Sequence, residues 1–167
     1  MSAIVAKTII LLNTVCYTPL MKLPHEQNET IPPNFYRVST KALILDESRT
    51  KFLIVRESNG KWEFPGGGLD YGSDAQENVH HELMEEMGIK TTSVAELPSY
   101  VLTAQHDRTG SWIMQLFYET TVENLDFTKS RECTAIMFAD KDSLPKTMYS
   151  NVPLFVEMFD PQKHKKL

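Results

Sequence analysis

Two short apolar runs in the first half of the chain predict neighbouring β-strands. Val38 with residues 42–45 (ALIL) forms the first run, and residues 52–55 (FLIV) form the second. The polar residues 46–49 (DESR) between them are typical of a turn. Both runs are nearly continuous rather than alternating, which is the pattern of strands that are covered on both faces.

A helix is predicted immediately before Gly88. Asp74 has a glutamate three residues later, which is the spacing of a helix N-terminal capping box, and Ser73 precedes it. Gly88 is a typical C-terminal stop. The apolar residues recur every four positions and form one buried stripe, made of Ala75, Val79, Leu83 and Met87.

The rest of the chain adds more strands and a second helix. Residues 93–103 and 112–122 read as two long strands, and the turn 106–110 (HDRTG) joins them as a hairpin. Residues 133–139 predict a further strand, and Asn151 with Pro153 opens a helix that runs to Phe159. This order of elements predicts an α/β (α+β) fold with helices packed on a mixed β-sheet.

Proline and charge mark the expected domain boundaries. Residues 22–35 contain three prolines among polar residues and read as a loop, so residues 1–35 are expected to be an N-terminal extension. Residues 36–160 are expected to form one domain. Residues 161–167 are expected to be a basic, solvated C-terminal tail.

Composition narrows the class of protein. The formal net charge is −5 and the pI is about 5.5, so the sequence lacks the basic stripe of a nucleic-acid-binding protein. The two cysteines, Cys16 and Cys133, have no metal-binding spacing, which favours the reducing cytoplasm. The apolar residues 9–16 after Lys7 resemble the start of a signal peptide, but they lack a small-x-small cleavage site and are too short to cross a membrane. We therefore expect a cytoplasmic protein that binds neither nucleic acid nor membrane.

The candidate chemistry lies around the helix that ends at Gly88. Gly66, Gly67 and Gly68 precede it, and a run of glycines lets another group approach the main chain closely. Glu82, Glu85 and Glu86 lie within one turn of the helix. Each feature alone has an ordinary explanation, a structural turn or a solvated acidic face. Together they favour a site for a hard divalent cation such as Mg²⁺, which prefers oxygen ligands.

These residues also resemble the signature of a known family. Residues 62–67 (WEFPGG) and 81–89 (HELMEEMGI) are similar to the Nudix box, Gly-x5-Glu-x7-Arg-Glu-U-x-Glu-Glu-x-Gly-U, in which U is aliphatic. Gly67 takes the first position, and the box spans residues 67–89. The order of elements extends the resemblance to residues 36–160. It implies a Nudix-like α/β/α sandwich with a mixed β-sheet on which the box helix packs.

Two positions depart from the signature. Ser73 stands where the first glutamate is expected, and His81 stands where arginine is expected. In the family these two side chains brace the loop and the helix against each other. Because both have changed, neither leaves an unpaired charge, and Ser73 and His81 can bond each other.

The resemblance implies hydrolysis of a nucleoside diphosphate linked to another moiety, with Mg²⁺ or Mn²⁺ as cofactor. It implies that Glu82, Glu85 and Glu86, together with Gly66, hold the metal, and that Glu82 also orients the attacking water. NDP-sugars, (d)NTPs and dinucleoside polyphosphates all remain open as substrates. Residues 103–106 (TAQH) lack the proline that follows the box in ADP-ribose hydrolases, so ADP-ribose is disfavoured as the substrate.

Further residues are candidates for the site. Glu132 is the candidate for the later acid that serves many Nudix enzymes as base or metal ligand, and it is equally an ordinary loop acid. Arg56 and Glu63 are candidates for substrate contacts, with rim charges as the alternative. Trp62 either stacks on a base or belongs to the core. Gly67 and Gly68 are expected to bind substrate through their main chain.

Two other functions compete with hydrolysis. The changes at Ser73 and His81 motivate a degenerate Nudix domain that binds a nucleotide or a protein without turnover. A glycine-loop nucleotide kinase is disfavoured, because no Gly-Lys-Ser/Thr follows the glycines. The first 35 residues are expected either to shape a homodimer interface or to cover the pocket.

Overall fold

Strands β1 (Arg37–Leu43) and β2 (Phe52–Arg56) are buried on both faces over most of their length. In a computed structural model of the chain, which describes residues 35–165, their successive side chains enter two different hydrophobic clusters. Leu53 and Val55 enter one cluster, whereas Phe52 and Ile54 enter the other. This alternation explains the continuous apolar runs in the sequence, since a strand between two layers needs apolar residues on both sides.

The strands form two sheets, where the sequence pattern predicts one. In the first sheet β6 (Trp112–Val122) lies between β1, to which it is parallel, and β5 (Tyr100–Gln105) with β4 (Thr91–Val94), to which it is antiparallel. In the second sheet β2 lies between β3 (Trp62–Glu63) and β7 (Ala135–Ala139), and both pairings are antiparallel. The first sheet is mixed, as expected, and the predicted hairpin of β5 and β6 is confirmed.

Helix α1 (Ala75–Met87) covers the first hydrophobic cluster. The Asp74 side chain accepts hydrogen bonds from the main-chain N–H groups of Gln76 and Glu77, which confirms the predicted N-cap. Val79, Leu83 and Met87 are fully buried, and Gly88 ends the helix at a positive φ of 67°. The helix therefore begins, ends and packs where the sequence predicts.

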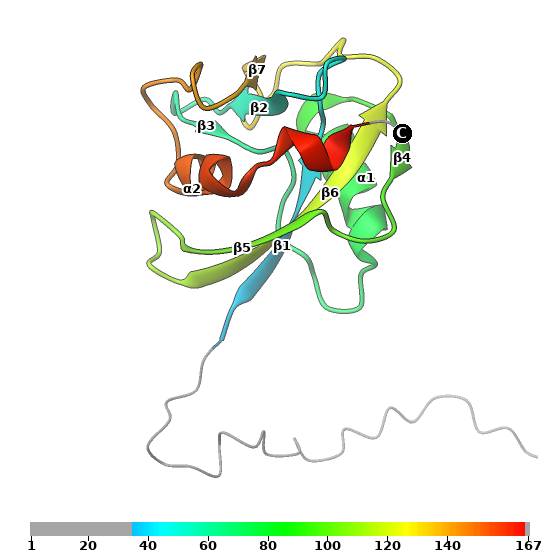
Figure 1. Cartoon of the computed structure of the whole chain (residues 1–167). Coiled ribbons are helices and arrows are strands. Elements are labelled where there is room, and N and C mark those ends of the chain that lie inside the picture. The colour runs from blue at the N-terminus through cyan, green and yellow to red at the C-terminus, as the bar shows by residue number, and fades with distance from the viewer. Residues whose placement is uncertain (1–34, 166–167) are drawn as a thin grey trace, which may run out of the picture. The chain divides into compact units, whose positions relative to one another are not determined.

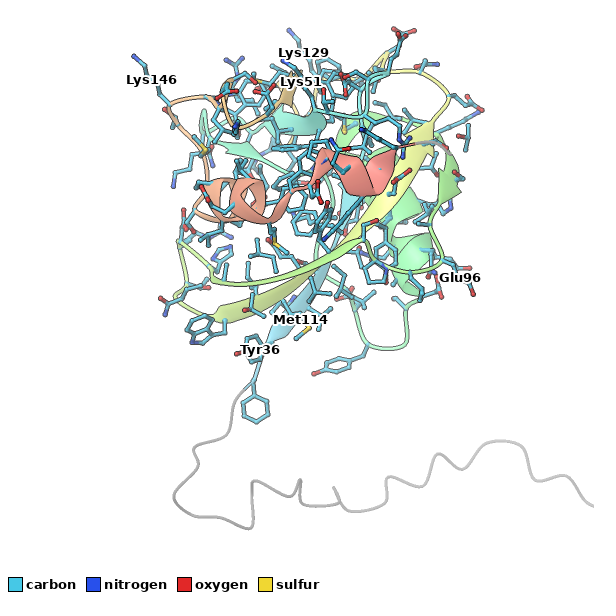
Figure 2. All side chains as sticks on the ribbon, viewed as in Figure 1. Tyr36, Lys51, Glu96, Met114, Lys129 and Lys146 are labelled. Carbon is cyan, nitrogen blue, oxygen red and sulfur yellow. The ribbon has the colours of Figure 1, made fainter. Side chains whose placement is uncertain are left out.

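Helix α2 (Asn151–Met158) covers the second cluster, on the opposite side of the strands. Its Phe155 ring lies 4.3 Å from the ring of Phe117 and 4.7 Å from that of Phe64, measured between centroids. The two helices thus enclose the strands as the outer layers of an α/β/α sandwich (Figure 1). Surface side chains such as Lys146 project away from these layers (Figure 2).

The C-terminal segment differs from the expected solvated tail. Residues Pro161–His164 form a 3₁₀ helix, and His164 is 5% exposed. The His164 ring bonds the Tyr100 hydroxyl at 2.9 Å and the Glu119 carboxylate at 2.8 Å. Burial alone would raise the pKa of Glu119. Hydrogen bonds from Arg49 and His164 lower it by more than that, so the pKa of Glu119 lies below its ordinary value. The partners of His164 are far from it in the sequence, so the basic residues at the chain end could not predict that this histidine is buried.

Two predicted strands also have different limits. The expected strand 93–103 is interrupted, because β4 ends at Val94 and β5 begins at Tyr100. Leu97 and Pro98 lie between them in a bend, where proline cannot donate to a neighbouring strand. The strand expected at 133–139 begins at Ala135.

The predicted N-terminal extension lies almost wholly outside the described residues. Its division from a 36–160 domain therefore stays a prediction, as does the position of the last two residues of the tail. Between residues 35 and 165 no helix is long and apolar enough to span a membrane.

The N-cap of α1 provides a test of what holds this helix in place. Asp74→Ala is expected to lower the free energy of unfolding by about 1 kcal/mol, because two N–H groups lose their acceptor. Urea denaturation measures the change. Asp74→Asn keeps an acceptor and should retain most of the stability, and Asp126→Ala, at an exposed loop aspartate, should have little effect. Equal losses for Asp74→Ala and Asp126→Ala would contradict the capping role.

Candidate active site

The glycine turn runs beside β1 and is bonded to it. Main-chain N–H groups of Thr40 and Ala42 donate to the carbonyls of Gly67 and Pro65, each at 3.0 Å. Gly66 has a φ of +116°, and a Cβ at this position would overlap the carbonyl oxygen of Thr40. Only glycine allows the turn to lie this close to the strand.

Two glutamates of α1 are in contact with this turn. The carboxylate of Glu86 accepts a hydrogen bond from the Gly66 N–H at 3.1 Å. The carboxylate of Glu82 occupies the space that a Cβ on Gly67 would need. The glycines therefore bring these two carboxylates against the main chain, as the spacing of the motif suggests.

Lys41, on β1, completes the arrangement from the other side. It is 6% exposed, and its Nζ donates to the carbonyls of Phe64 at 3.1 Å and Gly66 at 2.5 Å. Its charge also lowers the pKa values of Glu82 and Glu86. Lys41 thus holds the turn and opposes the negative charge beside it.

The net effect on the two glutamates is still unfavourable to their ionised forms. Burial raises the pKa of Glu86 to about 7, although Lys41 and the Gly66 N–H act in the opposite direction. Burial raises the pKa of Glu82 as well, and the charges of Glu85 and Glu132 add to the increase. Additional positive charge at this place would favour both carboxylates.

These groups line a cavity of about 470 Å³, within the size range of small-molecule sites. Its lining includes the helix glutamates, the glycine turn, Gln115 and Tyr149. Its charged lining mixes five acids with three cations: Glu57, Glu63, Glu82, Glu86, Glu132, Arg37, Lys41 and Arg108.

Most of the predicted site residues meet at this cavity. It is lined by Glu63, Gly66, Gly67, Gly68, Glu82, Glu86 and Glu132. Arg56 and Trp62 are not part of the lining. Instead the Arg56 guanidinium lies 5.8 Å from the centre of the Trp62 ring, and Trp62 packs at the edge of the second hydrophobic cluster.

Glu85 lies outside the cavity lining, on the exposed side of α1. Its carboxylate is 3.4 Å from the His81 ring, one helical turn earlier, and both side chains are largely exposed. The Ser73–His81 bond that the sequence allows is not formed among the described residues, where His81 pairs with Glu85. The family's brace is therefore absent here.

Several lining residues were missed by the sequence reasoning. Arg37, Ser39 and Lys41 alternate along β1, which places all three on one face of the strand. Polar residues at every second position of an otherwise apolar strand are the signal that was available for them. Gln115 on β6 lines the same cavity, but a single glutamine within a long strand gives no comparable signal.

The residues present fit a divalent metal. Between residues 35 and 165, no three His, Cys, Asp or Glu side chains converge as a complete ligand set. Mg²⁺ does not require one, because it keeps several waters and takes only one or two carboxylates together with substrate phosphates. Glu82 and Glu86 supply such carboxylates, and burial raises the pKa of both, so a cation beside them would favour their ionised, ligating forms.

Comparison with known proteins agrees with this geometry. The model of the NUDIX domain matches residues 35–158. A MutT-like protein of Streptomyces ambofaciens is 29% identical over 129 residues, which cover 77% of this chain and 79% of that protein. The mouse protein nucleoside diphosphate-linked moiety X motif 6 is 25% identical over 69% of this chain, which spans only 38% of its length. The crystal structure of a MutT protein from Methanosarcina mazei superposes with a TM-score of 0.65 at 23% identity, covering 81% of this chain and all of the other.

The burial of Glu86 predicts a pH-dependent stability. Its pKa is raised on folding, so its contribution to stability is complete below about pH 4.5 and is lost as the pH rises through about 7. Relative to Glu86→Gln, the metal-free protein should therefore lose up to about 3 kcal/mol across this interval. Urea denaturation in EDTA at several pH values measures the difference. Glu96→Gln, at an exposed glutamate, is the control, and parallel pH profiles for the protein and Glu86→Gln would contradict the prediction.

Proposed function

The chain belongs to the NUDIX domain family and is a Nudix-type pyrophosphohydrolase, and on this premise we propose its reaction in more detail. We propose that it hydrolyses, with Mg²⁺ or Mn²⁺, the pyrophosphate linkage of a nucleoside diphosphate joined to another moiety. NDP-sugars, (d)NTPs and dinucleoside polyphosphates are the candidate substrates. The observation that carries the proposal is the contact of Glu82 and Glu86 with the glycine turn inside one cavity.

Glu82 and Glu86 are proposed to hold the metal at this turn. The bound metal would neutralise charge on the phosphate oxygens and lower the pKa of a water molecule. The Gly66 carbonyl is a further proposed ligand, and it shares its oxygen with Lys41. Glu85 would have to turn away from His81 to reach the same place, so we propose that it acts through water.

The remaining charged residues suit a substrate that carries phosphates. Arg37, Lys41 and Arg108 line the cavity, and their positive charges would orient the diphosphate and stabilise its developing charge. Glu132 also lines the cavity and is exposed, and its charge acts on Glu82 and Glu86. Its proposed role is to accept a proton from the attacking water, a role for which Glu82 is the alternative.

The setting of this activity is proposed from the sequence. The net charge of −5 favours a small nucleotide over a nucleic acid or a membrane as the partner, and the cysteine content favours the cytoplasm. The names of the relatives, which include a MutT-like protein and a nucleoside diphosphate-linked moiety X protein, support a nucleotide substrate without selecting one. A homodimer remains a proposal for the full chain.

A hydrolysis screen with glutamate variants tests the proposal. The protein is expected to release nucleoside monophosphate or phosphate from at least one of the three nucleotide classes, and only with Mg²⁺ or Mn²⁺. Glu86→Gln should lower kcat/KM by about 100-fold or more, because it removes a buried charge at the turn. Glu85→Gln should lower it by roughly 10-fold, in keeping with a role through water.

Three results would contradict the proposal. Full activity of both Glu85→Gln and Glu86→Gln would overturn the metal assignment. Turnover in EDTA would overturn the metal dependence. No turnover of any nucleotide by the unmodified protein would favour the alternative of a binding module, for which the changed positions Ser73 and His81 give a reason. Glu96→Gln serves again as the exposed control.

A further inference from the structure

Three polar side chains from three different elements form a chain of hydrogen bonds at the α2 end of the cavity. The Asn151 Nδ2 atom donates to the Glu63 carboxylate at 2.6 Å and to the Gln115 Oε1 atom at 3.0 Å. Gln115 and Asn151 are 2% and 3% exposed. Glu63 and Gln115 both line the cavity, so the two ends of this chain of hydrogen bonds face its interior.

The carboxylate of Glu63 sets the direction of every bond in the chain. An ionised carboxylate only accepts, and the same oxygen also accepts from the Phe64 N–H at 2.8 Å. Asn151 must therefore turn its NH₂ group toward Glu63, and the same NH₂ group reaches Gln115. Gln115 must then present its oxygen to Asn151, which leaves its Nε2 as the donor on the free side. Among the described residues no acceptor bonds this Nε2, and no donor bonds the second Glu63 oxygen.

The hydroxyl of Ser39 adds an independent observation. Ser39 and Gln115 are paired in the register of β1 and β6, and Ser39 also lines the cavity. Ser39 is 8% exposed, and its Oγ is buried without a hydrogen-bond partner, alone among the buried side-chain polar atoms of residues 35–165. Leaving a buried hydroxyl unbonded is costly, so this group is better explained by a ligand that bonds it.

We propose that these residues read the base of the substrate and select a lactam, the N–H beside C=O that is found in guanine, uracil and thymine. The N–H of the base donates to the free oxygen of Glu63. The C=O of the base accepts from the Gln115 Nε2. This inference rests on the proposed nucleotide substrate and names the class of base that the same site takes.

Ser39 is what separates lactam bases from adenine and cytosine. Those two bases also offer an N–H donor beside an acceptor, but the acceptor is a ring nitrogen with a single lone pair. A carbonyl oxygen has two lone pairs and can accept from both Gln115 and Ser39. A ring nitrogen bonded to Gln115 would leave the Ser39 hydroxyl unbonded, as it is in the free protein.

The positions of Glu63, Gln115 and Ser39 in the cavity are compatible with a nucleotide whose phosphates lie at the glycine turn. Glu63 is followed directly by Phe64, Pro65 and the glycine turn, so base and phosphate contacts come from one continuous segment. Gln115 lines the same cavity as Glu82 and Glu86. A nucleotide with its base at Gln115 and Glu63 and its phosphates at the acids of α1 would therefore occupy this one cavity.

Binding of nucleosides tests base selection separately from hydrolysis. Guanosine, uridine, adenosine and cytidine carry no phosphate, and their dissociation constants can be measured by titration NMR in EDTA. Guanosine and uridine should bind about tenfold more tightly than adenosine and cytidine. The same order is expected for kcat/KM on GTP, UTP, ATP and CTP with Mg²⁺.

Three variants change the proposed contacts one at a time. Gln115→Met removes the donor that both kinds of base would use and should weaken the binding of all four nucleosides, by about tenfold for guanosine and uridine. Glu63→Gln places a donor opposite the base N–H and should also weaken the binding of all four. Ser39→Ala should reduce the preference while leaving the melting temperature of the free protein unchanged or higher, since it removes an unbonded hydroxyl. Gln162→Met, at an exposed glutamine outside the cavity, is the matched control.

The outcomes separate this inference from the proposed hydrolysis. A lactam preference in nucleoside binding that falls in Ser39→Ala but not in Gln162→Met, together with weaker binding of all four nucleosides in Gln115→Met, supports the inference even if no nucleotide is hydrolysed. Equal binding of the four nucleosides, no binding at the highest soluble concentrations, unchanged binding in Gln115→Met, or a preference that survives Ser39→Ala overturns it, even if hydrolysis is active.

Discussion

The carboxylates of Glu82 and Glu86 lie against a main-chain turn, and the rest of the structure must compensate for the hydration that they lose there. Glu82 and Glu86 lie against Gly67 and Gly66 in a position where water cannot fully solvate their charge. Burial of a charge is tolerated only when opposite charge or hydrogen-bond donors replace the lost water. Lys41 supplies part of the opposite charge, and the turn supplies one N–H. The charge that is still uncompensated is the physical reason for the cation proposed at this site.

Contacts with the surrounding fold hold the glycine turn and α1 in place. The turn cannot move away from β1, because the N–H groups of Thr40 and Ala42 are bonded to it. Helix α1 cannot move away either, since its apolar stripe is buried and the Asn78 side chain bonds the Thr40 hydroxyl at 2.9 Å. The Ser130 hydroxyl bonds the main-chain carbonyl of Glu86 at 2.7 Å, which ties the segment before β7 to the same helix. These contacts hold the turn and α1 together without a bond between Ser73 and His81.

The features that sequence predicted are those with a local cause. Asp74, the four-residue apolar period and Gly88 define α1 within the helix itself, so its limits could be read directly. Gln115, Asn151 and Glu63 are separated by at least 36 residues from one another, and only the packing of α2 on the sheets brings them together. The exposed position of Glu85 has a similar reason, because its pairing with His81 depends on side-chain direction rather than on spacing.

The proposed base recognition and the proposed bond cleavage draw on different parts of the chain. The acids at the glycine turn come from α1, whereas the side chains at the far end of the cavity come from β3, β6 and α2. On this proposal, a substitution at Gln115 or Asn151 would alter which nucleotides are accepted and leave the acids of α1 in place. In descent with modification, such an arrangement would let new substrate preferences arise by single changes outside α1, while selection preserves the acids of α1.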